Sequence, residues 1–253
     1  MVDKDLLFIG CKSVTVSGIE LYEYTIREIL EYGKADFNRL VYFSAIKPID
    51  LFERKTVTKK QMENVDVFDL IPVFDTKTLK WCTDMLNLVT KKDGWVFNHN
   101  TNNFQCVVID GDDIEVLRIN RSNFKDIMDS IALMFAVQRN DPYEKYEYYD
   151  NSDDFVKEVI DEEVQKELEE QKNSKSKVTI SSVIEAVACH RDSGVNANTV
   201  GDLNMYQLFR ILARIQQKNI YDNNMRAIYS GNIADVKKIN FDDISWLKNL
   251  DNK

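Results

Sequence analysis

Three short apolar runs separated by turn-forming residues constrain the fold of this chain more than any other feature. An asparagine-rich loop separates residues 95–97 from residues 104–109, and residues 114–119 follow the turn that begins at Asp110 and Gly111. Runs of this length favour β-strands, and Asp-Gly between two of them favours a tight hairpin. The sequence therefore predicts a meander of three antiparallel strands.

Amphipathic helices are expected on both sides of this meander. Residues 36–44, 78–89 and 122–135 place apolar side chains every three to four positions, which is the period of a helix with one buried face. Residues 5–10 and 13–18 are expected to form two further strands. Residues 1–140 therefore predict an α+β domain, a small antiparallel sheet packed against helices.

Side chains that can cap helices mark where each helix should begin. Thr25 and Glu28 have the spacing of a capping box, and Gly33 supplies a stop for the short helix that they open. The other expected caps are Thr78, Asn120 or Ser122, Ser181 or Ser182, and Asp202 or Asn204.

The excess negative charge of the chain lies in one segment. Residues 141–172 contain thirteen acidic residues and four lysines, a balance of −9, which equals the net charge of all 253 residues. Apolar residues at helical spacing between Phe155 and Leu168 indicate that this segment is a helix able to pack on something. We expect residues 141–177 to be an acidic helical linker, ending in a polar run that acts as a flexible joint.

The tyrosines beside the acidic helix allow two interpretations. Tyr143, Tyr146, Tyr148 and Tyr149 suit a protein interface, because tyrosine combines a large contact area with a polar tip. They equally suit packing of the linker against its own domain.

The last block, residues 178–253, predicts a domain made only of helices. One helix is expected from about residue 181, a longer one through Leu208 and Ile215, and a separate one around Tyr221 to Tyr229 that ends at Gly231. The chain finishes on an apolar cluster that includes Trp246, Leu247 and Leu250. A terminus with this composition should pack on its own domain or on a partner.

Several classes of function are disfavoured by the composition. No apolar run reaches the roughly 18–20 residues that span a bilayer, and the first residues do not resemble a secretory signal. We therefore expect a cytoplasmic protein that is not associated with a membrane. The acidic segment would repel a phosphate backbone, so no nucleic acid is expected. Four scattered cysteines and two histidines supply no zinc or disulfide pattern, so no metal or cofactor is expected.

No catalytic motif is present, and we expect no enzyme activity. Glycine patterns that cradle phosphate, nucleophile elbows and zinc-protease helices are missing. Asp110, Asp112 and Asp113 are best explained as a turn, because Ile114 and Arg121 stand where a calcium-binding loop needs oxygen ligands. If an enzyme site were assembled from distant residues, these three aspartates and His99 would be its candidates.

Packing patterns near both ends resemble a family of phage proteins. Part of the C-terminal block resembles the C-terminal part of tail assembly chaperones and related tail-morphogenesis proteins of phages that infect low-GC bacteria. The resemblance rests on Leu203 to Gln216, Tyr221 and Asp222, Met225 to Asn232, and Ile244 to Leu247. Residues 178–184 fit the same arrangement, and residues 24–30 resemble the helix near the start of such proteins.

This resemblance implies a non-enzymatic helper in the host cell cytoplasm that holds the tape-measure protein and recruits major tail-tube subunits. A structural virion protein of the tail, connector or baseplate remains the alternative, and self-association is possible in either case. If the C-terminal block grips a partner helix, its anchors should be Phe209, Tyr229, Trp246 and Leu247. The alternative is that these four side chains fill the core of their own block.

Overall fold

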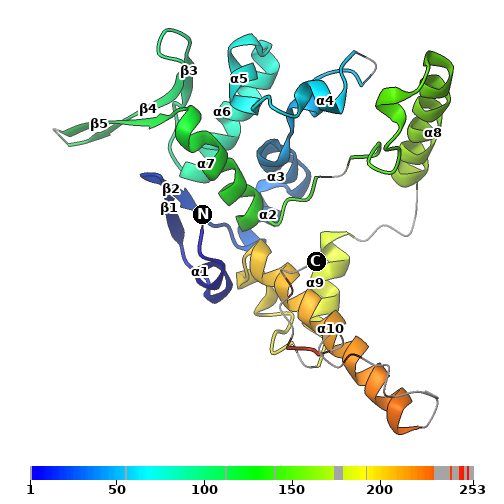
Figure 1. Cartoon of the computed structure of the whole chain (residues 1–253). Helices are drawn as coiled ribbons and strands as arrows, with labels where there is room; N and C mark the ends of the chain where they lie inside the picture. The colour runs from blue at the N-terminus through cyan, green and yellow to red at the C-terminus, as the bar shows by residue number, and fades with distance from the viewer. Residues whose placement is uncertain are drawn as a thin grey trace.

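A computed structural model describes residues 2–54, 56–111, 113–139, 141–173, 179–191, 193–230, 240, 245–247 and 250. The expected α+β class is confirmed, with a two-stranded and a three-stranded antiparallel sheet among helices and a helical C-terminal region (Figure 1). The helices are α1 (Lys4–Ile9), α2 (Ile26–Tyr32), α3 (Lys34–Val41), α4 (Lys59–Met62), α5 (Val67–Leu70), α6 (Thr76–Thr90), α7 (Arg121–Met134), α8 (Asp154–Asn173), α9 (Ile180–Cys189) and α10 (Met205–Tyr229). Short 3-10 turns cover Tyr42–Ala45, Pro48–Leu51, Ile71–Val73, Tyr149–Asn151 and Val200–Asp202.

The first sheet is a hairpin of β1 (Ser13–Val16) and β2 (Ile19–Tyr22). Its two turn residues, Ser17 and Gly18, have φ angles of 50° and 81°. Two positive φ angles give the turn a twist that matches the twist of the strands. The strand predicted at residues 13–18 is thereby confirmed.

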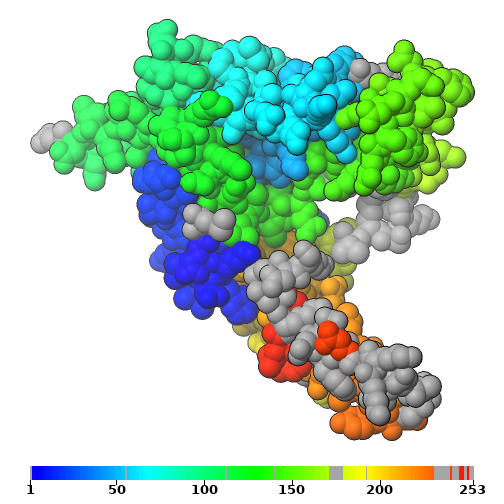
Figure 2. Space-filling model, viewed as in Figure 1, coloured from blue at the N-terminus to red at the C-terminus, as the bar shows by residue number. Residues whose placement is uncertain are grey.

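The second sheet is the predicted meander, formed by β3 (Val96–Asn98), β4 (Asn103–Asp110) and β5 (Asp113–Ile119). Asp110 pairs with Asp113 across the turn, as expected for a tight hairpin. One face of the sheet buries Phe104, Cys106, Leu117 and Ile119 against the helices. The far half of the β4–β5 hairpin projects from the body of the molecule (Figures 1 and 2).

The strand predicted at residues 5–10 is wrong, because these residues form the helix α1. The carboxylate of Asp3 accepts a hydrogen bond from the backbone N–H of Asp5 at 2.8 Å and caps this helix. Leu7 is fully buried, whereas Leu6, Phe8 and Ile9 remain exposed. A short apolar run has the same composition in a strand and in a helix, so its pattern alone did not separate the two.

The separate helix predicted around Tyr221 to Tyr229 is also wrong, because α10 runs without interruption from Met205 to Tyr229. The polar residues between Ile215 and Ile220 include no glycine or proline, and they continue the helix. The side chains become more polar along this helix, while the backbone stays helical.

The capping box of Thr25 and Glu28 is confirmed, as are the caps Asn120 and Asn204. Two other caps differ from expectation. Asp75 opens α6 by accepting from the Thr78 N–H at 2.6 Å, and Thr179 opens α9 by accepting from the Ser182 N–H at 3.1 Å. The predicted caps Thr78 and Ser182 therefore lie in the first turns of these helices.

The main core is continuous from the first block into α9 and α10. It joins Leu21, Phe37, Phe104, Ile131, Val187 and Leu208, among others. The division into an α+β domain of residues 1–140, an acidic helical linker of residues 141–177 and a helical domain of residues 178–253 stays a prediction. The expected flexible joint lies mostly outside the described residues.

The start of α10 is fixed to the first block by polar contacts around its capping residue. The amide Nδ2 of Asn204 donates to the Leu7 carbonyl at 3.0 Å and to Glu23 Oε2 at 2.6 Å. The Ile26 N–H donates to the Leu203 carbonyl at 2.8 Å. Gln207 Nε2 donates to the Phe8 carbonyl at 2.8 Å. These contacts set the direction in which α10 leaves the core.

Candidate partner-binding groove

The C-terminal end of α7 is shaped by a tight backbone turn. The N–H of Ala136 donates to the Leu133 carbonyl and the N–H of Val137 donates to the Ala132 carbonyl. This pair of bonds is the Schellman arrangement, which requires a positive φ at Ala136, observed at 49°. The turn ends the helix and places residues 136–138 beside α10.

One face of α10 lies opposite this turn. Tyr206, Phe209, Ala213 and Ile220 occur at intervals of three, four and seven residues, so they lie close to one face of the helix. From Tyr206 to Ile220 this face extends about 21 Å along the helix axis. Ile220 is half exposed at the outer end of the face.

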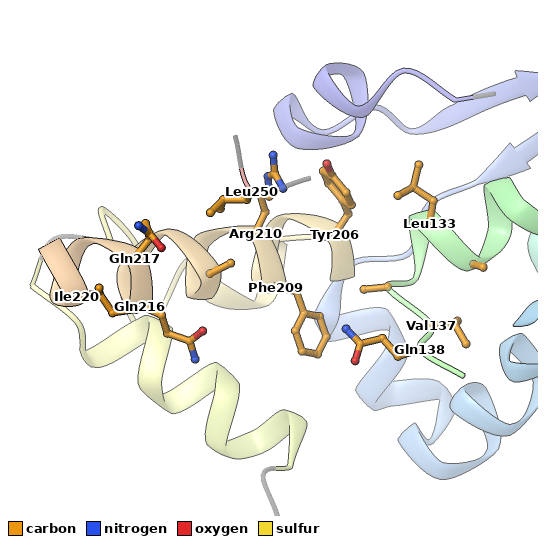
Figure 3. A pocket seen from close by; sticks show the side chains of 13 residues that line it. Leu133, Val137, Gln138, Tyr206, Phe209, Arg210, Gln216, Gln217, Ile220 and Leu250 are labelled. Atoms are coloured by element: carbon orange, nitrogen blue, oxygen red, sulfur yellow. The ribbon is translucent and has the colours of Figure 1, made fainter. Parts of the chain in front are cut away.

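A groove of about 630 Å³ lies between the end of α7 and this face of α10. Figure 3 shows Phe209 and Gln138 directed into it, with Leu250 beside Arg210. We call it the α7–α10 groove, and it is lined by Ala132, Leu133, Ala136, Val137, Gln138, Tyr206, Phe209, Arg210, Ala213, Gln216, Gln217, Ile220 and Leu250.

The lining is apolar with a polar rim. Alanines at three positions leave space between larger side chains, and the exposed Gln138 and Gln216 supply donors and acceptors. Gln217 is buried, and its amide donates to the Ser245 carbonyl. Arg210 is the charged residue of this lining, which includes no acidic side chain among the residues that the structure describes. Such a surface suits an amphipathic helix whose polar face does not carry excess positive charge.

The structure does not gather the four predicted anchors at one place. Phe209 is half-buried in the groove, whereas Tyr229 is 82% exposed at the end of α10. Twenty residues of helix separate the two, which is about 30 Å. Trp246 and Leu247 are 42% and 68% exposed.

The described part of the terminal apolar run lies along α10. Arg214 Nη1 donates to the Trp246 carbonyl at 2.8 Å, and Gln217 Nε2 donates to the Ser245 carbonyl at 3.1 Å. Leu250 then reaches the groove lining. Hydrogen bonds to its backbone carbonyls therefore hold this segment against α10, while the Trp246 and Leu247 side chains remain exposed.

The residues proposed for a hidden enzyme site are far apart where the structure describes them. His99 lies in the turn before β4, with its ring 5.0 Å from that of Phe97. Asp110 and Asp113 lie at the other end of β4, about 23 Å away. Asp112 lies outside the described residues. Within the described residues, no three His, Cys, Asp or Glu side chains come together to hold a metal ion.

The acidic segment packs against the first block through a buried arginine. Arg54 lies over the rings of Tyr143 and Tyr149, at 5.1 and 5.6 Å from their centroids, and 3.9 Å from Asp150. Both tyrosine hydroxyls donate to Asp161 Oδ1 on α8, at 3.0 and 2.9 Å.

The tyrosines beside α8 therefore serve mainly as packing within the chain. Tyr146 and Tyr149 are buried, and Tyr143 is partly buried against the same cluster, whereas Tyr148 remains exposed. Burial, together with the carboxylate of Asp161, raises the pKa of Tyr143 to about 12. The hydroxyl proton that Tyr143 donates is thus retained at neutral pH.

Sequence reasoning missed the half of the groove that comes from α7. Leu133 and Val137 flank the buried residues Met134 and Phe135 at the end of α7, and their apolar character was the available signal. It did not reveal that residues some seventy positions further along would face them.

Comparison with models of protein families gives a match in the C-terminal part of the chain. Residues 170–251 match a family model described as the YomV second domain. YomV is a protein of a Bacillus prophage region. The match covers about a third of the chain and includes α9 and α10. No curated protein and no solved structure matches the chain.

The match supports a phage-related protein and does not extend to a role in tail assembly, because its description names no chaperone. Among the described residues, no helix is long and apolar enough to cross a membrane.

Proposed function

We propose that this protein is a non-enzymatic phage tail assembly factor, a chaperone that holds an amphipathic helix of the tape-measure protein in the α7–α10 groove. The observation that carries the proposal is the groove itself, which combines an apolar floor with a polar rim along about four turns of α10. A helix bound there would place anchors at every third or fourth position against Phe209, Ala213 and Ile220.

The physical need for such a helper follows from the expected partner. A tape-measure protein is a long amphipathic helix, and its apolar face would associate with other copies if it were left exposed. This chain, with its net charge of −9, would cover that face and keep the complex soluble. Major tail-tube subunits would then be recruited by the bound pair.

The similarity to the YomV second domain supports the phage-related part of this proposal, because the matched residues 170–251 include one wall of the groove. The role in tail assembly comes from the resemblance of the sequence to tail chaperones. The absence of enzyme activity is likewise part of the proposal. Stoichiometric metal in the purified protein would reopen the question of an enzyme site.

The groove can be tested with one disruptive variant and one matched control. Ile220→Asp puts a charge on the groove at a half-exposed position, so it should leave folding intact and weaken binding by about 2 kcal/mol, or roughly thirtyfold. Tyr229→Asp introduces the same charge on the same helix outside the groove and should bind normally. Fluorescence anisotropy with labelled helical segments of a phage tape-measure protein measures both.

Trp246→Ala tests whether the Trp246 side chain contributes to the stability of the fold. Because its side chain is partly exposed and its carbonyl makes the described hydrogen bond, we expect an unchanged melting temperature. If no tape-measure or tail-tube segment binds the wild-type chain, or if Tyr229→Asp and Ile220→Asp weaken binding equally, the groove proposal is wrong.

A second candidate is a structural protein of the tail, connector or baseplate. The three-stranded sheet favours it, because components of large particles bury apolar faces on assembly. One face of this sheet exposes five aliphatic side chains, Val96, Val107, Ile109, Ile114 and Val116. Mass spectrometry of purified particles separates the two candidates. A structural protein is present at a fixed copy number, whereas a chaperone is found in infected cells and is missing from the particles.

A further inference from the structure

A second cavity adjoins the α7–α10 groove. It has a volume of about 510 Å³ and lies between α3, the turn after α7, the start of α9 and the start of α10. We call it the α3 cavity, and it is lined by Lys34, Asn38, Val41, Tyr42, Phe135, Ala136, Val137, Gln138, Thr179, Ile180, Met205 and Phe209.

The α3 cavity and the groove share four lining residues. Ala136, Val137 and Gln138 belong to the turn after α7, and Phe209 lies opposite them on α10. Figure 3 shows the side chains of Phe209 and Gln138 close to each other between these two elements. The two cavities therefore meet at this turn, and a segment that fills the groove can continue into the α3 cavity.

The charges of the two linings have one sign. Lys34 is the charged residue of the α3 cavity and Arg210 is that of the groove, and neither lining includes an acidic side chain among the described residues. By contrast, the cavity between α4 and residues 139–151 includes five acidic side chains. In a chain with 42 acidic and 33 basic residues, two adjoining cavities that contain only cations favour a negatively charged occupant.

We propose that the α7–α10 groove and the α3 cavity form one binding channel for a single acidic, amphipathic segment of the partner, which places a carboxylate beside Lys34. This inference rests on the proposed function, because it specifies the charge and the length of the segment that the groove would hold. Lys34 is half-buried, so water and salt screen its ion pair with a partner less than they would at an open surface.

The linings favour an acidic protein segment over a nucleic acid. Eight of the twelve residues that line the α3 cavity are apolar or aromatic, so its occupant must bury apolar side chains next to the carboxylate. A nucleic acid strand needs a row of cations along its phosphates, whereas each lining supplies one. A segment that combines apolar side chains with acidic ones meets both conditions.

A charge reversal with a matched control tests the channel. Lys34→Glu should weaken the binding of a phage tape-measure segment at least about tenfold, because it puts an acid beside the partner's carboxylate. Lys125→Glu makes the same charge change at an exposed residue of α7 outside both linings and should bind normally. Fluorescence anisotropy with overlapping labelled segments measures both, and circular dichroism verifies that each variant is folded.

Reversed peptides test the ion pair directly. Each acidic residue of the bound segment is replaced in turn by lysine, and one of these peptides should bind Lys34→Glu more tightly than it binds the wild-type chain. Raising the salt concentration from about 50 to about 500 mM should weaken binding to the wild-type chain more than binding to Lys34→Gln, because salt screens an ion pair that the amide cannot form.

A bulky substitution tests the length of the site. Asn38 is exposed and lines the α3 cavity, so Asn38→Trp should fill part of this cavity without unfolding the chain. Long segments should then bind at least about tenfold more weakly, whereas segments short enough to occupy only the groove should bind as before. Asn38→Ala is the control and should bind both kinds of segment normally.

The outcomes separate this inference from the chaperone proposal. If Ile220→Asp weakens binding but Lys34→Glu and Asn38→Trp do not, the groove is retained and the channel is overturned. The ion pair is also overturned if no reversed peptide prefers Lys34→Glu. If no tape-measure segment binds the wild-type chain, both the groove and the channel are wrong.

Discussion

The main core and the cluster around Arg54 are stabilised by different means. The main core joins side chains from Val2 to Ile215 and is almost entirely aliphatic and aromatic. The cluster beside α8 buries only Tyr146, Tyr149, Ile160 and Val164. It adds hydrogen bonds to Asp161 and the stacked guanidinium of Arg54.

The difference follows from where the charge of the chain lies. A segment with thirteen acidic residues has too few apolar side chains to bury a helix on hydrophobic contact alone. Tyrosines that pack and donate at the same time, together with arginines from the first block, compensate for this. Arg139 contributes in the same way, since it donates to both Asp50 and Asp141.

The largest expected effect comes from truncating the main core. Phe37 is fully buried and packs its ring against those of Tyr24 and Phe135, at 5.4 and 5.2 Å between centroids. Phe37→Ala should lower the free energy of unfolding by about 3–5 kcal/mol. Urea unfolding followed by circular dichroism measures this loss. Phe155→Ala is the control, because Phe155 is 74% exposed on α8, and it should change stability by less than about 0.5 kcal/mol.

A smaller and local effect is expected in the Arg54 cluster. Arg54→Ala removes the cation between two tyrosine rings and should loosen α8 by about 2 kcal/mol. Hydrogen exchange should show faster exchange in residues 154–170 and unchanged exchange in α6 and α7. Arg54→Lys keeps the charge but loses the planar stacking. Its exchange rates in α8 should lie between those of the wild-type chain and of Arg54→Ala. Equal loss of protection throughout the molecule would mean that the two clusters unfold as one unit.

The smallest expected effect is an opposite response of the two regions to pH. Burial raises the pKa of Glu23 to about 7 beside the main core, although the Asn204 amide partly offsets this. A raised pKa means that folding favours the protonated form of Glu23. The stability that the protonated Glu23 contributes is therefore fully present below about pH 4.5 and is lost as the pH rises through 7. With allowance for solvent screening, we expect a loss of about 1 kcal/mol.

Asp141 should respond in the other direction. Burial alone would raise its pKa, but the Tyr143 N–H and Arg139 together lower it below the usual 3.8. Its contribution is present above that value and is lost as the pH falls below it. Unfolding measured from pH 3 to pH 8 checks both signs, and Glu23→Gln should remove the decline at high pH. A decline that persists in this variant would assign it to another group.

Much of the secondary structure could be predicted from short-range patterns. The box of Thr25 and Glu28 involves residues three apart, and the Asp110–Gly111 turn joins strands that are neighbours in the chain. The failures also have local causes. Residues 5–10 have the same apolar composition in either state, and the polar stretch within α10 resembles a linker in sequence.

The candidate site could be predicted only in part. Phe209 lines the groove and also packs against the main core, so its role as an anchor stays a prediction. Its neighbours Leu133 and Val137 were not expected, because the fold brings them there from a different block. Tyr229 was grouped with Phe209 because both follow the same apolar pattern, and a continuous α10 then separates them along its axis.

The sequence by itself determined the meander of β3 to β5 and the helix caps at Thr25, Asn120 and Asn204, because hairpins and caps depend on hydrogen bonds between residues a few positions apart. Only the tertiary structure decided which faces became core, groove or open surface. That outcome depends on contacts such as Asn204 with Glu23 and Arg54 with Tyr149, whose partners lie far apart in the chain. An apolar stripe specifies that a face should be covered, but the segment that covers it is selected by the packing of the whole chain.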